Sequence, residues 1–141
     1  MPNAIFVEWK ERYSVGNNEL DDQHKGIISI INDLYTAILH QTTQRELNSI
    51  LDRLLEYTRS HFEREEQLME EVLFPDLAKH RIAHDILARR TSELREQALH
   101  NKNDVAVEAM SFLKDWWIDH IIVMDSQYKP YMEGKEGLDK R

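Results

Sequence analysis

Two histidines interrupt the apolar stripe of an otherwise ordinary helical segment in the third quarter of the chain. The inward positions of this segment follow one another at spacings of three and four residues: Leu77, His80, His84, Leu87, Thr91, Leu94 and Ala98. Such spacing is typical of one face of an amphipathic α-helix. Two imidazoles must therefore lie where a helix normally buries leucine, and any fold for this chain has to give their ring nitrogens partners.

Three other segments show the same periodicity, and the four segments together predict an all-α fold. We expect helices over about 19–41, 43–72, 76–100 and 103–128, after an irregular N-terminal arm at 1–18 and before a C-terminal tail. Thr43 and Glu46 form a capping-box pattern, Pro75 separates two helices, and Asn103 suits an N-cap. Because short connections place consecutive helices antiparallel, we expect a single domain, residues 1–141, folded as an up-down-up-down antiparallel four-helix bundle.

Composition narrows the chemistry and the environment. The chain has no cysteine, so disulfides, iron–sulfur clusters and thiolate metal sites are excluded. Its net charge of −8 argues against nucleic acid or an anionic membrane as a partner. No apolar run approaches the ~18 residues of a membrane span, and the N-terminus lacks the features of a secretory signal. We therefore expect a soluble, cytoplasmic protein, and a monomer.

Five histidines fall on the inward stripes, and two carboxylates join them. They are His24 on the first helix, His61 and Glu65 on the second, His80 and His84 on the third, and His120 and Asp125 on the fourth. A single inward histidine is usually a hydrogen-bonded core residue. Several together are different, because each unpartnered group costs about 1–3 kcal/mol against a total stability of about 5–15 kcal/mol. Coordination removes that cost, so the pattern predicts a metal site.

The number of potential ligands indicates two metal ions. Five imidazoles and two carboxylates exceed the needs of one ion, whereas they fit two octahedral ions if both carboxylates bridge the pair. An oxo or hydroxo bridge would then leave one coordination position open for a small molecule. Nitrogen-rich ligation with carboxylates suits iron, and suits manganese, cobalt or zinc less well.

The spacing of the last two candidate ligands conflicts with a regular helix. Asp125 lies five residues after His120, which rotates it by about 140° around a helix of 3.6 residues per turn. A π-bulge near Val123 or Met124, or a different angle of approach to the metal pair, would correct this rotation.

Four stretches of the chain resemble the hemerythrin family, and specifically its single-domain bacterial members. They are VGNNELDDQHKGI, HFEREEQLM, FPDLAKHRIAHDIL and DWWIDHIIVMD, and they span residues 15–125. The resemblance implies two non-haem iron ions with an oxo or hydroxo bridge that bind dioxygen reversibly, for carriage, delivery or storage and not for catalysis. It also implies that one iron is held by His80, His84 and His120. The other iron, which has the open position, would be held by His24 and His61. Glu65 and Asp125 would bridge the two.

Other residues near the ligands have weaker signals. The candidates for an apolar wall around the bound gas are Ile27, Ile28, Phe62, Trp116 and Trp117, and ordinary core packing explains each of them equally well. Trp117 stands where the family more often carries leucine, and Phe74 stands where it often carries tyrosine. His40 and His100 lie off the inward stripes, so we expect both at the surface.

Three other functions use similar residues. The same di-iron site would suit a sensor of oxygen, nitric oxide, redox state or iron, although sensor forms of the family usually carry a fused output domain. His84 and Asp85 also resemble the doublet of HD-type metal phosphohydrolases, but Asp85 lies off the inward stripe and no basic cluster for phosphate is evident. A ferritin-like di-iron oxidase requires Glu-x-x-His, which the sequence lacks.

Overall fold

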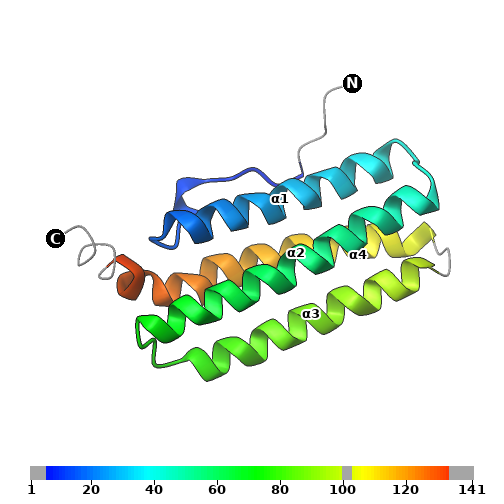
Figure 1. Cartoon of the computed structure of the whole chain (residues 1–141). Helices are drawn as coiled ribbons and strands as arrows, with labels where there is room; N and C mark the ends of the chain where they lie inside the picture. Colours follow the sequence, from blue (N-terminus) through cyan, green and yellow to red (C-terminus); the bar gives the residue numbers. More distant parts are fainter. Residues whose placement is uncertain (1–5, 100–102, 134–141) are drawn as a thin grey trace.

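A computed structural model of the chain describes residues 6–99 and 103–133; of residues 98, 99, 103–109 and 116 it describes the backbone alone. Its main elements are α1 (Asn18–Leu39), α2 (Gln44–Glu71), α3 (Leu77–Leu99) and α4 (Asn103–Asp119). Figure 1 shows these helices side by side, with each running opposite to the one before it. α1 and α3 each pack on both α2 and α4, so the four helices close into a bundle. The predicted all-α antiparallel four-helix bundle is confirmed, and no strand occurs in the described ranges.

The last part of the fourth helix differs from the regular helix expected over 103–128. A π-helix, η2 (His120–Met124), and a 3₁₀ turn, η3 (Asp125–Tyr128), replace it. The backbone N–H of Asp125 donates to the carbonyl of His120, which is the hydrogen bond of a π-helix. The wider turn brings the two side chains together, with Nε2 of His120 3.1 Å from Oδ1 of Asp125. The conflict raised by their spacing is thus resolved by a π-bulge.

The N-terminal arm is held along α1 by one asparagine side chain. Oδ1 of Asn32 accepts from the backbone N–H groups of Phe6 (2.8 Å) and Val7 (2.9 Å). Nδ2 of Asn32 donates to the carbonyl of Val7 at 2.8 Å. The arm continues into a 3₁₀ turn, η1 (Glu11–Tyr13). Its Val7 and Tyr13 are both buried and belong to the main apolar core.

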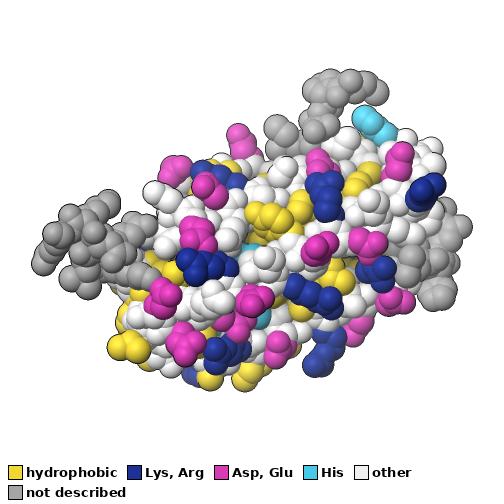
Figure 2. All heavy atoms as spheres, in the orientation of Figure 1, with side chains coloured by type: hydrophobic (Ala, Val, Ile, Leu, Met, Phe, Trp, Pro, Cys, Tyr) yellow, Lys and Arg dark blue, Asp and Glu magenta, His cyan; other side chains and the backbone are white. Residues whose placement is uncertain are grey.

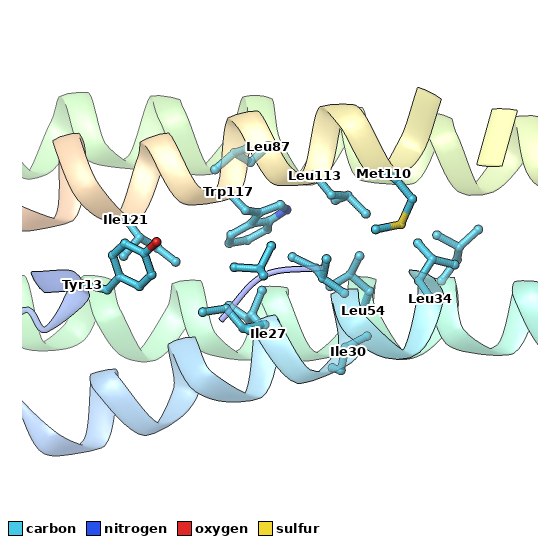
Figure 3. Packing of buried hydrophobic residues seen from close by; sticks show 14 of the residues in the cluster. Tyr13, Ile27, Ile30, Leu34, Leu54, Leu87, Met110, Leu113, Trp117 and Ile121 are labelled. Carbon is cyan, nitrogen blue, oxygen red and sulfur yellow. The ribbon is translucent and has the colours of Figure 1, made fainter. Parts of the chain in front are cut away.

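Large apolar side chains from all four helices fill the bundle. Figure 3 shows Met110, Leu113 and Trp117 of α4 facing Ile27, Ile30 and Leu34 of α1, with Leu54 of α2 and Leu87 of α3 beside them. These residues are nearly or wholly inaccessible to solvent, so apolar burial supplies the main driving force for the fold. Over residues 6–99 and 103–133, none of the helices combines the length and the hydropathy that a membrane span needs.

The connections after α1 and α2 end their helices with the same backbone geometry. In each, a residue with positive φ follows the helix: Gln41 (51°) after α1 and Leu73 (58°) after α2. Beyond Leu73, the N–H of Phe74 donates to the carbonyl of Met69 at 2.9 Å, which is the long bond of a Schellman motif. The turn directs Phe74 into the bundle, where its side chain is buried.

We expect Leu73→Gly to stabilise the protein by roughly 0.5–1 kcal/mol, because a left-handed conformation disfavours a leucine and not a glycine. Little packing is lost, since Leu73 is 83% exposed. Leu39→Gly is the matched control: this leucine is also exposed but helical, so glycine should destabilise there by about 1 kcal/mol. Urea denaturation measures both variants, and a destabilised Leu73→Gly would contradict the conformation of this turn.

Candidate metal centre

The structure brings all seven candidate ligands into one buried layer of the bundle. They come from the start of α1 (His24), the C-terminal half of α2 (His61, Glu65), the start of α3 (His80, His84), and the segment that follows α4 (His120, Asp125). Because neighbouring helices are antiparallel, these positions all lie towards the same end of the bundle. Each of the seven is at most 6% exposed. Figure 2 shows acidic and basic side chains intermixed on one face of the bundle.

The potential ligand atoms form two groups that share both carboxylates. The first group is Glu65, His80, His84, His120 and Asp125, and the second is His24, His61, Glu65 and Asp125. Within each group the atoms lie no more than 4.8 Å from one another. The protein therefore presents three imidazoles to one position and two to a neighbouring position.

Glu65 directs one carboxylate oxygen at each group. Its Oε1 lies 3.0 Å from Nε2 of His80 and 2.8 Å from Nε2 of His84. Its Oε2 lies 3.3 Å from Nε2 of His24 and 3.0 Å from Nε2 of His61. A carboxylate with this orientation can bind one cation through each oxygen.

Asp125 is divided between the two groups in the same way. Its Oδ1 lies 2.8 Å from Nε2 of His80 and 3.1 Å from Nε2 of His120, whereas its Oδ2 lies 3.1 Å from Nε2 of His24. Within the described residues, neither oxygen of Asp125 nor Nε2 of His120 makes a hydrogen bond, although all three atoms are buried. They approach one another without the direction that a hydrogen bond requires. Buried lone pairs that converge in this manner fit a bound cation, which would satisfy them by coordination.

Two residues outside the predicted set bond to the outer nitrogen, Nδ1, of a ligand imidazole, which is the ring nitrogen that faces away from the centre. Oε1 of Gln23 lies 2.7 Å from Nδ1 of His61, and Oε2 of Glu66 lies 2.9 Å from Nδ1 of His84. A carboxylate can only accept, so Nδ1 of His84 is the donor and the Nε2 lone pair is left for the centre. Neither residue is among the candidates predicted from the sequence. Each is adjacent in sequence to a candidate ligand, and that is the only signal the sequence offers for them.

Tyr128 is a third residue of the site that was not predicted from the sequence. Its hydroxyl donates to Oε2 of Glu65 at 2.9 Å, and its side chain is wholly buried. The edge of Phe74 packs against the Tyr128 ring, with centroids 6.1 Å apart. The tyrosine lies three residues after Asp125, in a segment that we expected to be the regular end of the last helix. Only the turn η3 places it over the site.

Electrostatics in the layer favour positive charge. Burial lowers the pKa of His24, but Asp125 and Glu65 outweigh burial and raise the pKa to about 9. The same balance raises the pKa of His80 to about 10. Burial raises the pKa of Glu65, but His61 and His24 overcome this and hold the pKa well below its usual value. Burial likewise raises the pKa of Asp125, but His120 and His24 overcome burial and lower the pKa, so both carboxylates stay ionised at neutral pH and attract cations.

An aromatic stack closes one side of the layer. The ring of Phe62 lies nearly parallel to that of His84, with centroids 3.8 Å apart, and also to that of Trp117 at 5.4 Å. Phe62, Trp117, Ile27 and Ile28 are all buried in the main apolar core, and ring contacts place Phe62 beside His84 and Trp117 beside His120. The side chain of Trp116 lies outside the described residues.

The remaining sequence candidates stay outside the centre. His40 is exposed, as expected, and His100 lies outside the described residues. Asp85 is exposed and belongs to neither ligand group. The structure therefore does not place the His84–Asp85 doublet as an HD-type site would need it.

A family model described as the hemerythrin HHE cation binding domain matches residues 15–132. The chain belongs to the hemerythrin family. This hemerythrin domain is 34% identical over 129 residues to a bacteriohemerythrin of Stenotrophomonas maltophilia, covering 89% of this chain and 80% of the relative. It is 34% identical over 121 residues to a hemerythrin-like protein of Naegleria gruberi, covering 86% and 89%.

Solved structures agree with the family assignment. A crystal structure of wild-type hemerythrin matches the fold with a TM-score of 0.80, over 91% of this chain and 98% of that chain, at 26% sequence identity. The family model and the converging histidines and carboxylates together assign a metal-cation-binding domain.

We expect Tyr128→Phe to destabilise the metal-free protein by about 1–3 kcal/mol, because a buried carboxylate loses a hydrogen-bond donor. Thermal or urea unfolding of the chelator-treated protein measures the loss. Tyr13→Phe is the control, since this tyrosine is also buried but lies in the main apolar core, whereas Tyr128 is the one bonded to Glu65. Equal effects of the two substitutions would show that the hydroxyl of Tyr128 does not support Glu65.

Proposed function

We propose that this hemerythrin domain binds dioxygen reversibly at two non-haem iron ions, as a carrier, a delivery protein or a store, and not as an enzyme. The observation that carries the proposal is the division of Glu65 and Asp125 between two imidazole groups, one oxygen to each group. Two cations side by side account for this division, whereas one cation at the larger group would leave His24 and His61 unused. Similarity to proteins named bacteriohemerythrin supports iron as the metal and dioxygen as the ligand.

The proposed ligands divide between the two ions. One iron would be held by His80, His84 and His120 and the other by His24 and His61, and Glu65 and Asp125 would be shared between them, together with an oxo or hydroxo group. The ion held by two imidazoles would have the position left for the gas. When bound, the two irons supply the electrons and the coordination position that dioxygen binding needs.

The role of the polypeptide is to restrain that chemistry. Ile27, Phe62 and Trp117 are at most 5% exposed, so the layer is bordered by large, mainly apolar side chains that exclude water. Exclusion of water and free protons limits irreversible oxidation of the centre. The hydroxyl of Tyr128 is occupied by Glu65, which fixes the bridging carboxylate in place.

The proposal predicts two irons per chain and a reversible colour change. We would reduce the protein under argon, count iron, and record the optical spectrum under argon, after exposure to air, and under argon again. A colour that appears in air and fades on removal of oxygen is the expected result. Two irons that oxidise once without return would contradict reversible binding and leave the metal site intact. Absence of stoichiometric iron would overturn the proposal altogether.

The variant His84→Leu tests the ligand set. Leucine at this inward position continues the apolar stripe of α3, so the metal-free helicity should be kept or raised, and stoichiometric iron binding should be abolished. Circular dichroism and iron analysis measure the two effects. His40→Leu, at an exposed position outside both ligand groups, should bind two irons as the unmodified chain does. A His84→Leu protein that retained both irons would refute the assignment.

A further inference from the structure

The two ligand groups differ in the charge of the residues behind them. In the smaller group, the outer nitrogen of His61 is bonded to the neutral side-chain amide of Gln23 at 2.7 Å. In the larger group, the outer nitrogen of His84 is bonded to the carboxylate of Glu66 at 2.9 Å. A carboxylate thus supports the larger ligand group, whereas a neutral amide supports the smaller one.

Glu66 is held so that this contact persists. Its Oε2 accepts from His84, while its Oε1 accepts from Nε of Arg81 at 3.0 Å. The side chain of Glu66 is 24% exposed, between the buried layer and solvent. It borders a surface pocket of about 320 Å³ between α2 and α3, which also reaches Phe62 and His84. With both oxygens engaged, Glu66 stays oriented towards the imidazole.

A carboxylate that accepts from Nδ1–H of an imidazole changes the ligand strength of Nε2 on the same ring. When Nδ1–H donates to an ionised acceptor, the hydrogen bond is stronger than one to a neutral amide, and the ring orientation and tautomer are fixed. Electron density at Nε2 rises, so the imidazole becomes a better ligand. Glu66 has this effect on His84. The metal position built from His80, His84 and His120 is therefore strengthened more than the other.

We propose that Glu66 is a positioning residue that makes the two metal positions unequal. It strengthens the position built from His80, His84 and His120, so that this position fills first and holds its ion more tightly. The inference rests on the two-metal site of the proposed function. It concerns Glu66, which lies outside the ligand set, and it adds an order of occupancy to that site.

The test adds Zn²⁺ to the chelator-treated full-length protein. Competition with a chromophoric chelator gives the two stepwise dissociation constants. Nitrogen-15 spectra of the histidine rings report which ligands are occupied. With one equivalent of Zn²⁺, we expect the Nε2 signals of His80, His84 and His120 to shift before those of His24 and His61. Glu66→Gln should weaken the tighter site by about 10–100-fold, as loss of such supporting partners does elsewhere.

Two further variants separate this effect from charge and from folding. Glu63→Gln removes the same charge from the same helix and borders the same pocket at an exposed position, so it should leave both constants unchanged. Gln23→Glu places a carboxylate behind His61, and it should tighten the weaker site. A gain in affinity cannot arise from a protein that fails to fold.

Each outcome has a distinct meaning. Equal constants for Glu66→Gln and Glu63→Gln, or first occupancy at His24 and His61, would overturn the role of Glu66. If the unmodified protein bound two Zn²⁺ in either case, the two-metal site would survive. If it bound fewer than two, the proposed function itself would fail.

Discussion

The carboxylate of Glu65 is the group around which the rest of the layer is organised. Nε2 atoms of four histidines lie within 3.3 Å of its oxygens, and Tyr128 donates to it from a fifth position. These partners come from α1, α2, α3 and the turn after the π-helix. A buried carboxylate without such partners would be strongly destabilising. The need to satisfy this one group therefore ties the registers of the helices to one another.

A polar layer of this kind weakens the bundle unless a cation completes it. Both oxygens of Asp125 are buried without hydrogen bonds in the described parts of the chain, and so are the outer nitrogens of His24 and His80. The apolar core beside the layer offsets part of that cost, through large side chains such as Trp117, Leu113 and Leu54. Stability and metal binding are consequently linked, because a metal that binds only the folded state stabilises that state.

The π-helix illustrates how the site shapes the backbone. A regular helix would carry Asp125 away from His120, and the extra residue of the π-turn returns it to the layer. The same segment then tightens into the turn that buries Tyr128. Irregular backbone is concentrated here, whereas α1, α2 and α3 remain regular over their whole length. Local distortion at a ligand pair is a smaller change than a shift of the whole helix.

Much of the fold could be predicted from the sequence because its signals are local. Helical periodicity assigned the four helices and the inward positions of the histidines, and the Thr43 cap of α2 is observed, with its side chain accepting from the N–H of Glu46. Leu73 and Gln41 gave no sign of their positive φ, because neither is the glycine that usually marks such a position. Trp117 of α4 is buried beside Phe62 of α2, and a contact between two helices could not be predicted from the pattern within either one.

The sequence by itself therefore determined which side chains face the interior, since that depends on helical spacing along a single segment. The tertiary structure alone decided which oxygen of Glu65 and of Asp125 faces which imidazoles. It also decided that Gln23, Glu66 and Tyr128 support the site. These contacts join residues of different helices, or depend on an irregular turn. Distances of about 3 Å between helices are set by the packing of the whole bundle, and no pattern within one helix encodes them.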